Sequence, residues 1–453
     1  MKTKDVNMLS GPIIPGMLKI TIPIMLMNVV QSLFNIIDMT ILKQFNAQDA
    51  VGAVGACGTL ITLITVLLTG IATGASVVIA RYIGKGDKDS IERAIGTTMT
   101  VSVVGSVTLM IIGITCARTF LSWTNCPDEL IDAATKYFQL YFAGVPICMI
   151  YTFAAPILRA SGDTRRPMVF LTIGGALKVL LTYILVGFCN LTVEGVALAT
   201  IFSWLVSSVL VMITLFKTDS IVKINPKRLR FYKREFGEMV YIGIPTGLQQ
   251  GLYSFANVII ATTVNGFGPD ATTGISIANT FDGILYQIVI APAAAVTYYV
   301  SQNVGKGNIK RAEQSIIRGM LITVTFGATL GAFSAIFSSQ LSSIMSDVPA
   351  VIAYSRQKMI IISSTYFICG INEIMCATMR GIRKPIIPTI STLIFMCGIR
   401  FLWVYLVFPL VPNLTFLYLI WPIGWVLSIV AITSFYFPSI RKLRREHSEP
   451  QLS

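Results

Sequence analysis

Two charged residues inside apolar segments are the strongest chemical signal in this sequence. Asp38 and Lys178 each lie within a run that is otherwise apolar enough to cross a lipid bilayer. A carboxylate in hydrocarbon needs a cation, a proton or water, and a buried ammonium must find an anion or lose its proton. We therefore predict that Asp38 and Lys178 form an ion pair if their helices are neighbours. Snorkelling of Lys178 to the membrane surface is the alternative that stays open.

Asp38 is the last member of a polar stripe. The polar residues recur at steps of three, four and three, which places them on one face of a helix. They are Asn28, Gln31, Asn35 and Asp38. Such a stripe lines a polar cavity or makes hydrogen bonds between helices. The amides fit both interpretations, whereas the carboxylate favours a functional site.

The composition indicates which elements carry these residues. The chain has 453 residues, of which 54% are hydrophobic and 12% are charged, and its mean hydropathy is +0.74. A soluble domain carries roughly 25% charged residues. The apolar runs are continuous rather than alternating, and each exceeds the roughly 20 residues that a membrane helix needs. Because only helices or closed barrels satisfy the backbone in lipid, we predict an all-α polytopic membrane protein.

Polar gaps divide the chain into twelve expected spans. They cover residues 17–41, 51–80, 94–117, 134–158, 168–189, 194–216, 239–264, 273–303, 314–337, 351–379, 386–409 and 415–437. Most of the 35 Lys and Arg residues fall in the N-terminal segment, in alternate loops and in the C-terminal tail. Positive residues mark the cytoplasmic side, so both termini are predicted to be cytoplasmic. The net charge of +14 then reflects topology and anionic lipid, not nucleic acid.

The chain resembles itself at a period near 220 residues. Ile22-Pro23 recurs as Ile244-Pro245, and Gly84-Lys85-Gly86 recurs as Gly305-Lys306-Gly307. Six spans in each half give both halves the same orientation, a parallel repeat that transporters commonly use. We expect an N-terminal lobe (1–216), a basic linker (217–238), a C-terminal lobe (239–437) and a basic tail (438–453).

The repeat transfers the polar stripe into the second half. The equivalent positions are Gln250, Tyr253, Asn257 and Ile260. The ionisable member of the stripe thus belongs to the first half alone. Other charged residues lie in or near spans of the second half, where each is a site residue or part of a structural ion pair. These are Asp282, Glu373 and Arg400.

Other classes of function lack their residues. The one histidine, His447, lies in the charged tail, which argues against hydrolases that use an intramembrane histidine. No GxxxxGK[ST] motif is present, so ATP is not the expected energy source. The eight cysteines are scattered without a CxxC pair, so we expect neither a metal site nor a cofactor. Gly70 and Gly74 form a GxxxG motif, a weak signal for close helix packing.

Several motifs together resemble one family. They are Asn35-Ile36-Ile37-Asp38, the segment from Asp49 to Gly55, the segment from Arg159 to Pro167, the segment from Gly195 to Thr200 and the paired Gly-Lys-Gly loops. Over nearly its whole length the chain resembles the multidrug and toxic compound extrusion transporters, and Pro245 to Gln250 resembles their DinF-like branch. The resemblance implies two six-helix bundles and an antiporter. Such a protein expels organic cations, drugs or metabolites against sodium ions or protons.

The resemblance also suggests roles for single residues. Asp38 matches the acidic residue of the first helix, and Thr200 matches a sixth-helix threonine of the cation site. The fifth-helix asparagine and aspartate of the family are replaced here by Lys178 and Thr182. The family's seventh-helix glutamate is absent, with Tyr253 near its position. A fixed ammonium repels sodium. We therefore expect proton coupling through Asp38, with Lys178 as its counter-ion.

Two alternatives remain at this stage. A flippase for lipid-linked oligosaccharides, from the same superfamily, would line its cleft with several cationic residues. A membrane receptor or scaffold would need no ionisable residue in its first span. Our expectation is a monomeric transporter in a bacterial inner membrane, surrounded by lipid, with lipophilic cations as substrates.

Overall fold

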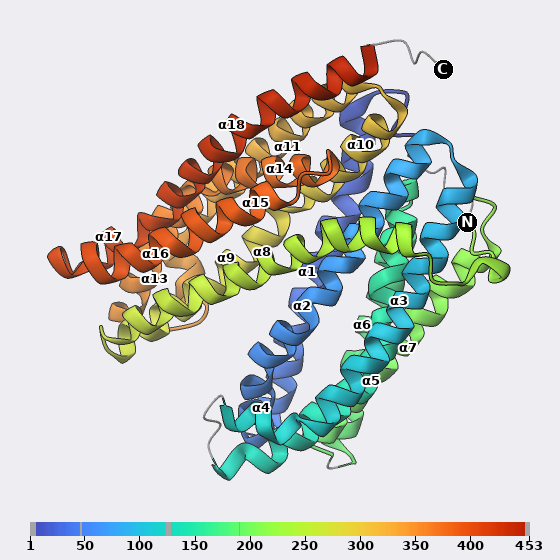
Figure 1. The fold of residues 1–453 in the computed structure, drawn as a ribbon. Helices are drawn as coiled ribbons and strands as arrows, with labels where there is room; N and C mark the ends of the chain where they lie inside the picture. Colours follow the sequence, from blue (N-terminus) through green and yellow to red (C-terminus); the bar gives the residue numbers. More distant parts are fainter. Residues whose placement is uncertain (1–5, 46–47, 124–127, 190, 449–453) are drawn as a thin grey trace. The chain divides into compact units, whose positions relative to one another are not determined.

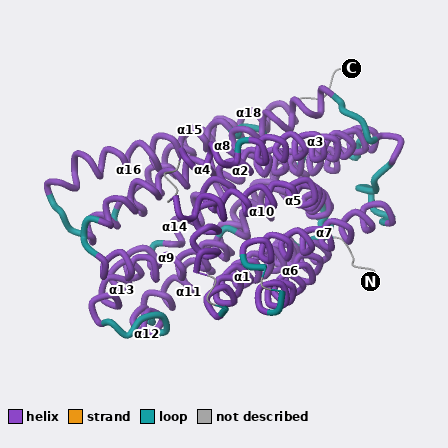
Figure 2. The backbone as a smooth tube through the Cα atoms, turned by 90° about the horizontal axis from the view of Figure 1, so that it is seen from below, coloured by secondary structure: helices purple, strands orange, loops and turns teal. Residues whose placement is uncertain are grey.

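The computed structural model describes residues 6–45, 48–123, 128–189 and 191–448, and every secondary-structure element in these ranges is a helix. Figure 1 shows long helices along the whole chain, and Figure 2 shows only short loops between most of them. The predicted all-α class is confirmed.

Seven α-helices precede the basic linker. They are α1 (Ile13–Gln44), α2 (Gln48–Lys85), α3 (Lys88–Thr115), α4 (Ala117–Trp123), α5 (Asp128–Ser161), α6 (Arg165–Gly187) and α7 (Val193–Lys217). The linker contains the short 3₁₀ helix η1 (Pro226–Arg228).

The helices after the linker are more often broken. They begin with α8 (Lys233–Asn265), α9 (Pro269–Val289), α10 (Ala291–Lys306), α11 (Ile309–Ile336), α12 (Ser338–Ser343), α13 (Pro349–Ser364) and α14 (Tyr366–Gly381). The chain continues through α15 (Ile386–Ser391), η2 (Thr392–Gly398), α16 (Ile399–Leu402), η3 (Trp403–Val407), η4 (Phe408–Leu410), α17 (Leu414–Tyr418) and α18 (Ile420–Ser448). Both η2 and η3 are π-helical.

The helices account for the expected spans. Within the described ranges, ten helical segments are long and apolar enough to cross a membrane, and the pair α13 and α14, bent by 48°, makes an eleventh. The remaining expected span is α8, which has 33 residues but carries Gln249, Gln250 and Asn257 in its membrane-length part. The polar stripe lowers the hydropathy of α8, and for this reason α8 is not among the ten apolar segments.

The chain separates by its internal contacts into two units. Unit 1 comprises Leu26–Gly247 with Met1–Val6, and unit 2 comprises Leu248–Ser453 with Asn7–Met25. These units cut across the expected lobe boundaries within α1 and within α8. The first part of α1 belongs to unit 2, and the linker together with the first part of α8 belongs to unit 1.

Close glycine packing explains why the start of α8 belongs to unit 1. A Cβ atom added at Gly70 would lie 2.5 Å from the Gly243 carbonyl oxygen, and one added at Gly74 would lie 2.3 Å from the Met239 carbonyl oxygen. Small residues let two membrane helices approach to backbone contact. The packing role expected for the GxxxG motif of α2 is confirmed.

Ion pairs attach the linker to unit 1. Arg228 pairs with Asp89 at 2.7 Å, and Arg93 pairs with Glu235 at 3.0 Å. Asn225 donates to the Glu92 carboxylate at 3.0 Å. The basic linker is therefore folded onto α3 and is not a free tether.

Hydrogen bonds from α10 and α11 attach the N-terminal segment to unit 2. The Arg311 guanidinium donates to the carbonyl oxygens of Met8, Ser10 and Gly11 at 2.9–3.0 Å. The Asn303 amide donates to the Met8 carbonyl oxygen at 3.1 Å. These bonds capture backbone groups, so they fix the path of the chain into α1 whatever the side chains are.

The Gly-Lys-Gly loops lead into matching helix caps. Asp87 caps α3 by accepting the Ser90 N–H, and Asn308 caps α11 by accepting the Arg311 N–H, both at 3.1 Å. Hydrogen bonds from the Ser90 hydroxyl and then from its N–H lower the pKa of Asp87 below 3.8. The two units thus use one cap geometry, charged in one and neutral in the other.

Candidate functional site

The Asp38 carboxylate and the Lys178 ammonium form an ion pair inside unit 1. Lys178 Nζ lies 2.5 Å from Asp38 Oδ2, and Asp38 is 5% exposed. The side chain of Lys178 is 16% exposed, so neither charge reaches bulk solvent freely. The contact expected from the sequence is present, and snorkelling of Lys178 is not observed.

Both partners of Asp38 come from one face of α6. The Thr182 hydroxyl donates to Asp38 Oδ1 at 3.4 Å, while Lys178 holds Oδ2. Residues four apart on a helix lie one above the other, so α6 presents an ammonium and a hydroxyl to the two oxygens of one carboxylate. The arrangement fixes Asp38 in a single orientation.

A glycine of α6 allows α1 to come this close. A Cβ atom added at Gly175 would lie 1.8 Å from Cε2 of Phe34. Gly175 precedes Lys178 by one helical turn, and Phe34 precedes Asp38 by one turn. The phenyl ring therefore occupies the space that any larger residue would need, which sets the separation of the two helices at the ion pair. This positioning role could not be predicted from the residue types alone.

For the other predicted residues of unit 1, the structure gives the burial of three and a hydrogen bond of one. Asn28 is partly buried and Gln31 is exposed on α1. Thr200 is buried on α7 and donates its hydroxyl to the Val196 carbonyl oxygen at 2.8 Å, so this bond binds the hydroxyl to its own helix. The side chain of Asn35 lies outside the described residues. The cavity and coupling roles of these residues stay predictions.

In unit 2, Arg400 is buried without a carboxylate. It is 2% exposed, and its Nη1 donates to Asn257 Oδ1 on α8 at 2.8 Å. Its guanidinium carbon lies 4.9 Å from the centre of the Trp421 ring. Among the ion pairs of the described residues, none involves Arg400. Of the two roles expected for Arg400, the structural ion pair is therefore absent from the described residues.

A second buried cation lies on the same tryptophan. Lys358 is 3% exposed and pairs with Asp282, itself 7% exposed, at 3.0 Å. Lys358 also donates to the amide oxygen of Asn279, and its Nζ lies 6.0 Å from the Trp421 ring centre. Asp282 thus belongs to an ion pair, one of the two roles expected for it.

The remaining predicted acid of unit 2, Glu373, lies near two tyrosines. Glu373, on α14, interacts with the hydroxyls of Tyr253 and Tyr286. Asn372 donates to the Tyr253 hydroxyl at 3.2 Å. The polar stripe of α8 is thus joined to α14 through Tyr253.

Gln249, the neighbour of the predicted Gln250 on α8, makes buried contacts. Gln250 is exposed, whereas Gln249 is 3% exposed, donates to Cys376 Sγ at 3.4 Å and accepts from Arg380 at 3.2 Å. The lining role predicted for Gln250 remains a prediction.

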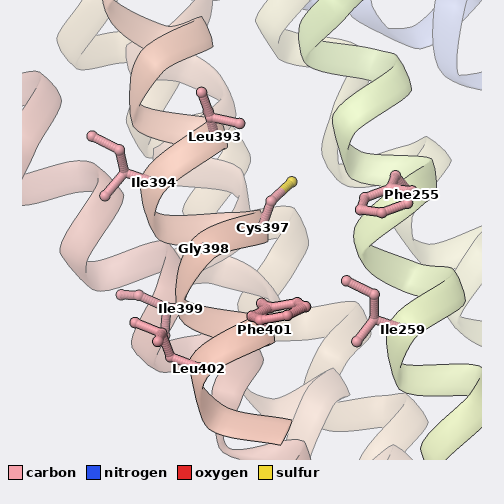
Figure 3. Close-up of a pocket in the computed structure, with 9 residues that line it drawn as sticks. All are labelled: Phe255, Ile259, Leu393, Ile394, Cys397, Gly398, Ile399, Phe401 and Leu402. Carbon is pink, nitrogen blue, oxygen red and sulfur yellow. The ribbon is translucent and has the colours of Figure 1, made fainter. Parts of the chain in front are cut away.

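An apolar pocket separates α8 from η2 and α16. Its volume is about 470 Å³. Figure 3 shows Phe255 and Ile259 of α8 across the gap from Cys397 and Phe401. The other lining residues are Leu393, Ile394, Gly398, Ile399 and Leu402. The Arg400–Asn257 hydrogen bond joins the same two elements, but neither residue lines the pocket.

Three residues of these clusters were missed from the sequence. Lys358 ends a polar stretch that begins at Ser355, close to the start of the expected span, so its charge did not mark it as a buried residue. Trp421 and Gly175 carry no charge, so they do not stand out within their apolar segments. Only the packing of α9, α13, α16 and α18 reveals Lys358 and Trp421 as neighbours.

A profile of the MatE family matches residues 23–184 and 245–406. The two segments start 222 residues apart and end 222 residues apart, which confirms the internal repeat. Lys178 and Arg400 lie equally far from the starts of their segments. The two buried cations are therefore equivalent positions of the repeat.

Relatives and solved structures agree with the profile. The chain is 24% identical to "Probable multidrug resistance protein YoeA" of Bacillus subtilis, over 84% of this chain and 83% of that protein. It is 21% identical to "FAD transporter" of Shewanella oneidensis, over 70% and 71%.

The fold is also that of a solved MATE transporter. The structure titled "Outward-facing conformation of a multidrug resistance MATE family transporter of the MOP superfamily" superposes with a TM-score of 0.90 at 21% identity, over 98% of this chain and all of that one. The family profile covers most of the chain in two copies. The chain belongs to the MatE family of multi-pass membrane transporters and is not an enzyme.

Proposed function

We propose that this protein is a secondary active efflux transporter that exports organic cations, drugs or metabolites in exchange for protons by alternating access. The observation that supports the proposal is the buried Asp38–Lys178 pair, a titratable carboxylate held by a fixed cation inside a membrane unit. Intramembrane ionisable residues commonly serve as proton or ion sites.

Proton binding would act directly on the contacts of this pair. A proton on Asp38 removes the negative charge that attracts the Lys178 ammonium. Lys178 is then a buried cation without a counter-charge, which is costly. A state in which Lys178 reaches water or another anion becomes favoured, and a ligand can shift an equilibrium only by such a difference between states. Thr182 is the residue that would keep Asp38 oriented in both forms.

Sodium fits this site poorly. The position nearest the carboxylate is taken by the ammonium at 2.5 Å, and a second cation at that distance would be repelled. We therefore propose protons rather than sodium as the coupling ion, with neither metal nor organic cofactor. Thr200, on α7, is proposed as a more distant member of the coupling region.

The polar stripes are proposed to line the substrate path. In unit 1 these residues are Asn28, Gln31 and Asn35, and in unit 2 they are Gln250, Tyr253, Asn257, Asp282, Glu373 and Arg400. The relatives named for multidrug resistance support drugs as cargo, and the relative named for FAD supports metabolites. We propose a monomer in a bacterial inner membrane with both termini cytoplasmic, as the distribution of basic loops indicates.

Ethidium efflux from proteoliposomes tests the proposal. The protein is reconstituted as wild type and as Asp38→Asn, and efflux is followed under an imposed proton gradient and, separately, an imposed sodium gradient. Efflux driven by protons and lost in Asp38→Asn is the expected result. Sodium-driven efflux by the wild-type protein would overturn the assignment of the coupling ion.

Oligosaccharide flipping is the alternative function within the superfamily. The same liposomes, loaded with a fluorescent lipid-linked oligosaccharide, are expected to show no protein-dependent flipping. Flipping in the absence of ethidium transport would replace the efflux proposal. A receptor or scaffold would give neither signal.

A further inference from the structure

We infer that unit 2 contains a binding site for the anionic group of an organic solute, with Arg400 as the charge that receives it. The inference rests on the proposed transport function and specifies one substrate class within it, metabolites that bear a carboxylate, sulfonate or phosphate. Two observations support the inference: the charge balance around Arg400 and its place in the repeat.

The charge of Arg400 is uncompensated by its neighbours. A buried cation is usually paired with an anion, because desolvation of a lone charge is costly. Arg400 is 2% exposed, yet its partners are the neutral Asn257 amide and the Trp421 ring. A ring face attracts a cation but supplies no net negative charge.

The acids of unit 2 that face this region are already engaged. Asp282 is paired with Lys358 at 3.0 Å. Glu373 interacts with Tyr253 and Tyr286 and lies near Arg380. The described part of the cluster around Trp421 therefore holds two cations and one carboxylate, and the excess positive charge belongs to Arg400.

The repeat shows what is missing. Lys178 of unit 1 and Arg400 of unit 2 are equivalent positions, and each reaches from its helix to the polar stripe of the first helix of its half. Lys178 finds the Asp38 carboxylate. At the corresponding position of α8 the chain has Ile260, so Arg400 bonds to Asn257 instead. An anion that comes from outside the chain would fill the role that Asp38 fills in unit 1.

Arg400 itself is buried, but the residue that accepts its hydrogen bond lies at an exposed position. Asn257, which accepts its Nη1 bond, is exposed on α8. Arg400 lies in α16, a single turn between the π-helical segments η2 and η3. Such π-helical turns occur frequently at functional sites. The guanidinium has further N–H groups for a bidentate bond to a carboxylate or phosphate.

The depth of Arg400 favours a free solute over a lipid headgroup. The span that contains it ends at Leu410, and ten residues at the helical rise correspond to roughly 15 Å. A hydrocarbon core is about 30 Å thick, so Arg400 lies near its middle, beyond the depth of a headgroup.

Two flavins test the inference on the purified wild-type transporter in detergent. Riboflavin and flavin mononucleotide share one fluorescent ring system and differ in a single phosphate group. Binding is followed by flavin fluorescence anisotropy, so no transport is required. We expect flavin mononucleotide to bind at least about tenfold more tightly than riboflavin, the factor that corresponds to 1.4 kcal/mol. Equal affinity for the two flavins in the wild-type protein would overturn the inference.

Variants locate the effect at Arg400. Arg400→Gln is expected to abolish the difference between the flavins, and Arg400→Lys to retain most of it. Lys310→Gln, at an exposed cation of α11 in the same unit, is the matched control and should leave the difference unchanged. Discrimination that persists in a monodisperse Arg400→Gln protein would assign it to another cation and contradict the inference.

The same titration separates the two proposals and the two sources of phosphate. Loss of ethidium efflux in liposomes together with intact flavin discrimination would refute proton-coupled cation export and leave the anion site standing. Adding dioleoylphosphatidic acid to the detergent should not displace flavin mononucleotide. Displacement at equimolar lipid would reassign the site to lipid headgroups and overturn the solute interpretation.

Discussion

The two units place a cation at the same position of the repeat and surround it differently. In unit 1, Lys178 meets a carboxylate and a threonine fixes that carboxylate from the same helix. In unit 2, Arg400 meets an amide and an aromatic ring. A neutral, titratable pair is suited to exchange of a proton, whereas a permanent charge that never loses its proton is suited to binding. The two halves of the repeat therefore keep a cation at the same position but surround it with groups of different chemistry.

Removal of the two cations should have unequal effects on stability, and this is the largest expected effect. Lys178→Met leaves Asp38 as a buried carboxylate without a counter-charge, which costs about 3–5 kcal/mol. Arg400→Met leaves no charge behind, and we expect a cost of about 1 kcal/mol or less from the lost amide bond. Thermal unfolding in detergent, followed by size-exclusion chromatography, measures both. Equal losses would break the comparison between the units.

Restoring the residues that the family resemblance implies should create a sodium site in unit 1. In Lys178→Asn with Thr182→Asp, the ammonium is gone and two carboxylates with an amide face one another. We expect sodium to stabilise this variant by about 2.7 kcal/mol at a concentration a hundred times its dissociation constant. The measurement is the melting temperature in sodium chloride against choline chloride. A wild-type protein stabilised by sodium to the same extent would contradict the role assigned to Lys178.

Widening the gap between α1 and α6 should weaken the pair without changing its charges. Gly175→Val drives a side chain into Phe34, and overpacking of this kind costs about 1–3 kcal/mol. We expect lower proton-driven efflux with a smaller loss of stability than in Lys178→Met. Gly283→Val is the control, because a Cβ atom there meets nothing within 4 Å. Equal effects of the two variants would remove Gly175 from the positioning of the pair.

The smallest expected effect concerns the helix caps. The lowered pKa of Asp87 means that its carboxylate stabilises the folded state at pH values above the pKa that this group has in the unfolded chain. This contribution is lost as the pH falls through the lowered folded pKa. The Asn308 cap of α11 does not titrate, so acid should loosen the first turn of α3 alone, by about 1 kcal/mol. Hydrogen exchange between pH 5 and 3 tests this, and Asp87→Asn should abolish the dependence.

Much of this architecture could be predicted because lipid imposes simple rules. Apolar runs longer than the bilayer must be helices, so the spans, the repeat and the position of Asp38 followed from the order of residues. The pair with Lys178 could be anticipated because few partners for a buried carboxylate exist. A charge inside an apolar run is visible without knowledge of the fold.

What escaped prediction depends on packing between distant segments. Trp421 and Gly175 have ordinary residue types, and their importance arises only from the cations and the ring that lie against them. Lys358 is charged but lies in a polar run that hides it. The assignment of residues 7–25 to unit 2 rests on backbone hydrogen bonds from Arg311 and Asn303, and backbone acceptors leave no trace in a sequence.

Proton release on substrate binding tests the central claim most directly. Ethidium is added to the purified protein in weakly buffered detergent solution, and a pH-sensitive dye records protons released per transporter. If Asp38 is the coupling acid, the wild type releases protons at a pH where Asp38 is partly protonated, and Asp38→Asn releases none while still binding ethidium. Proton release of equal size in Asp38→Asn would contradict the account.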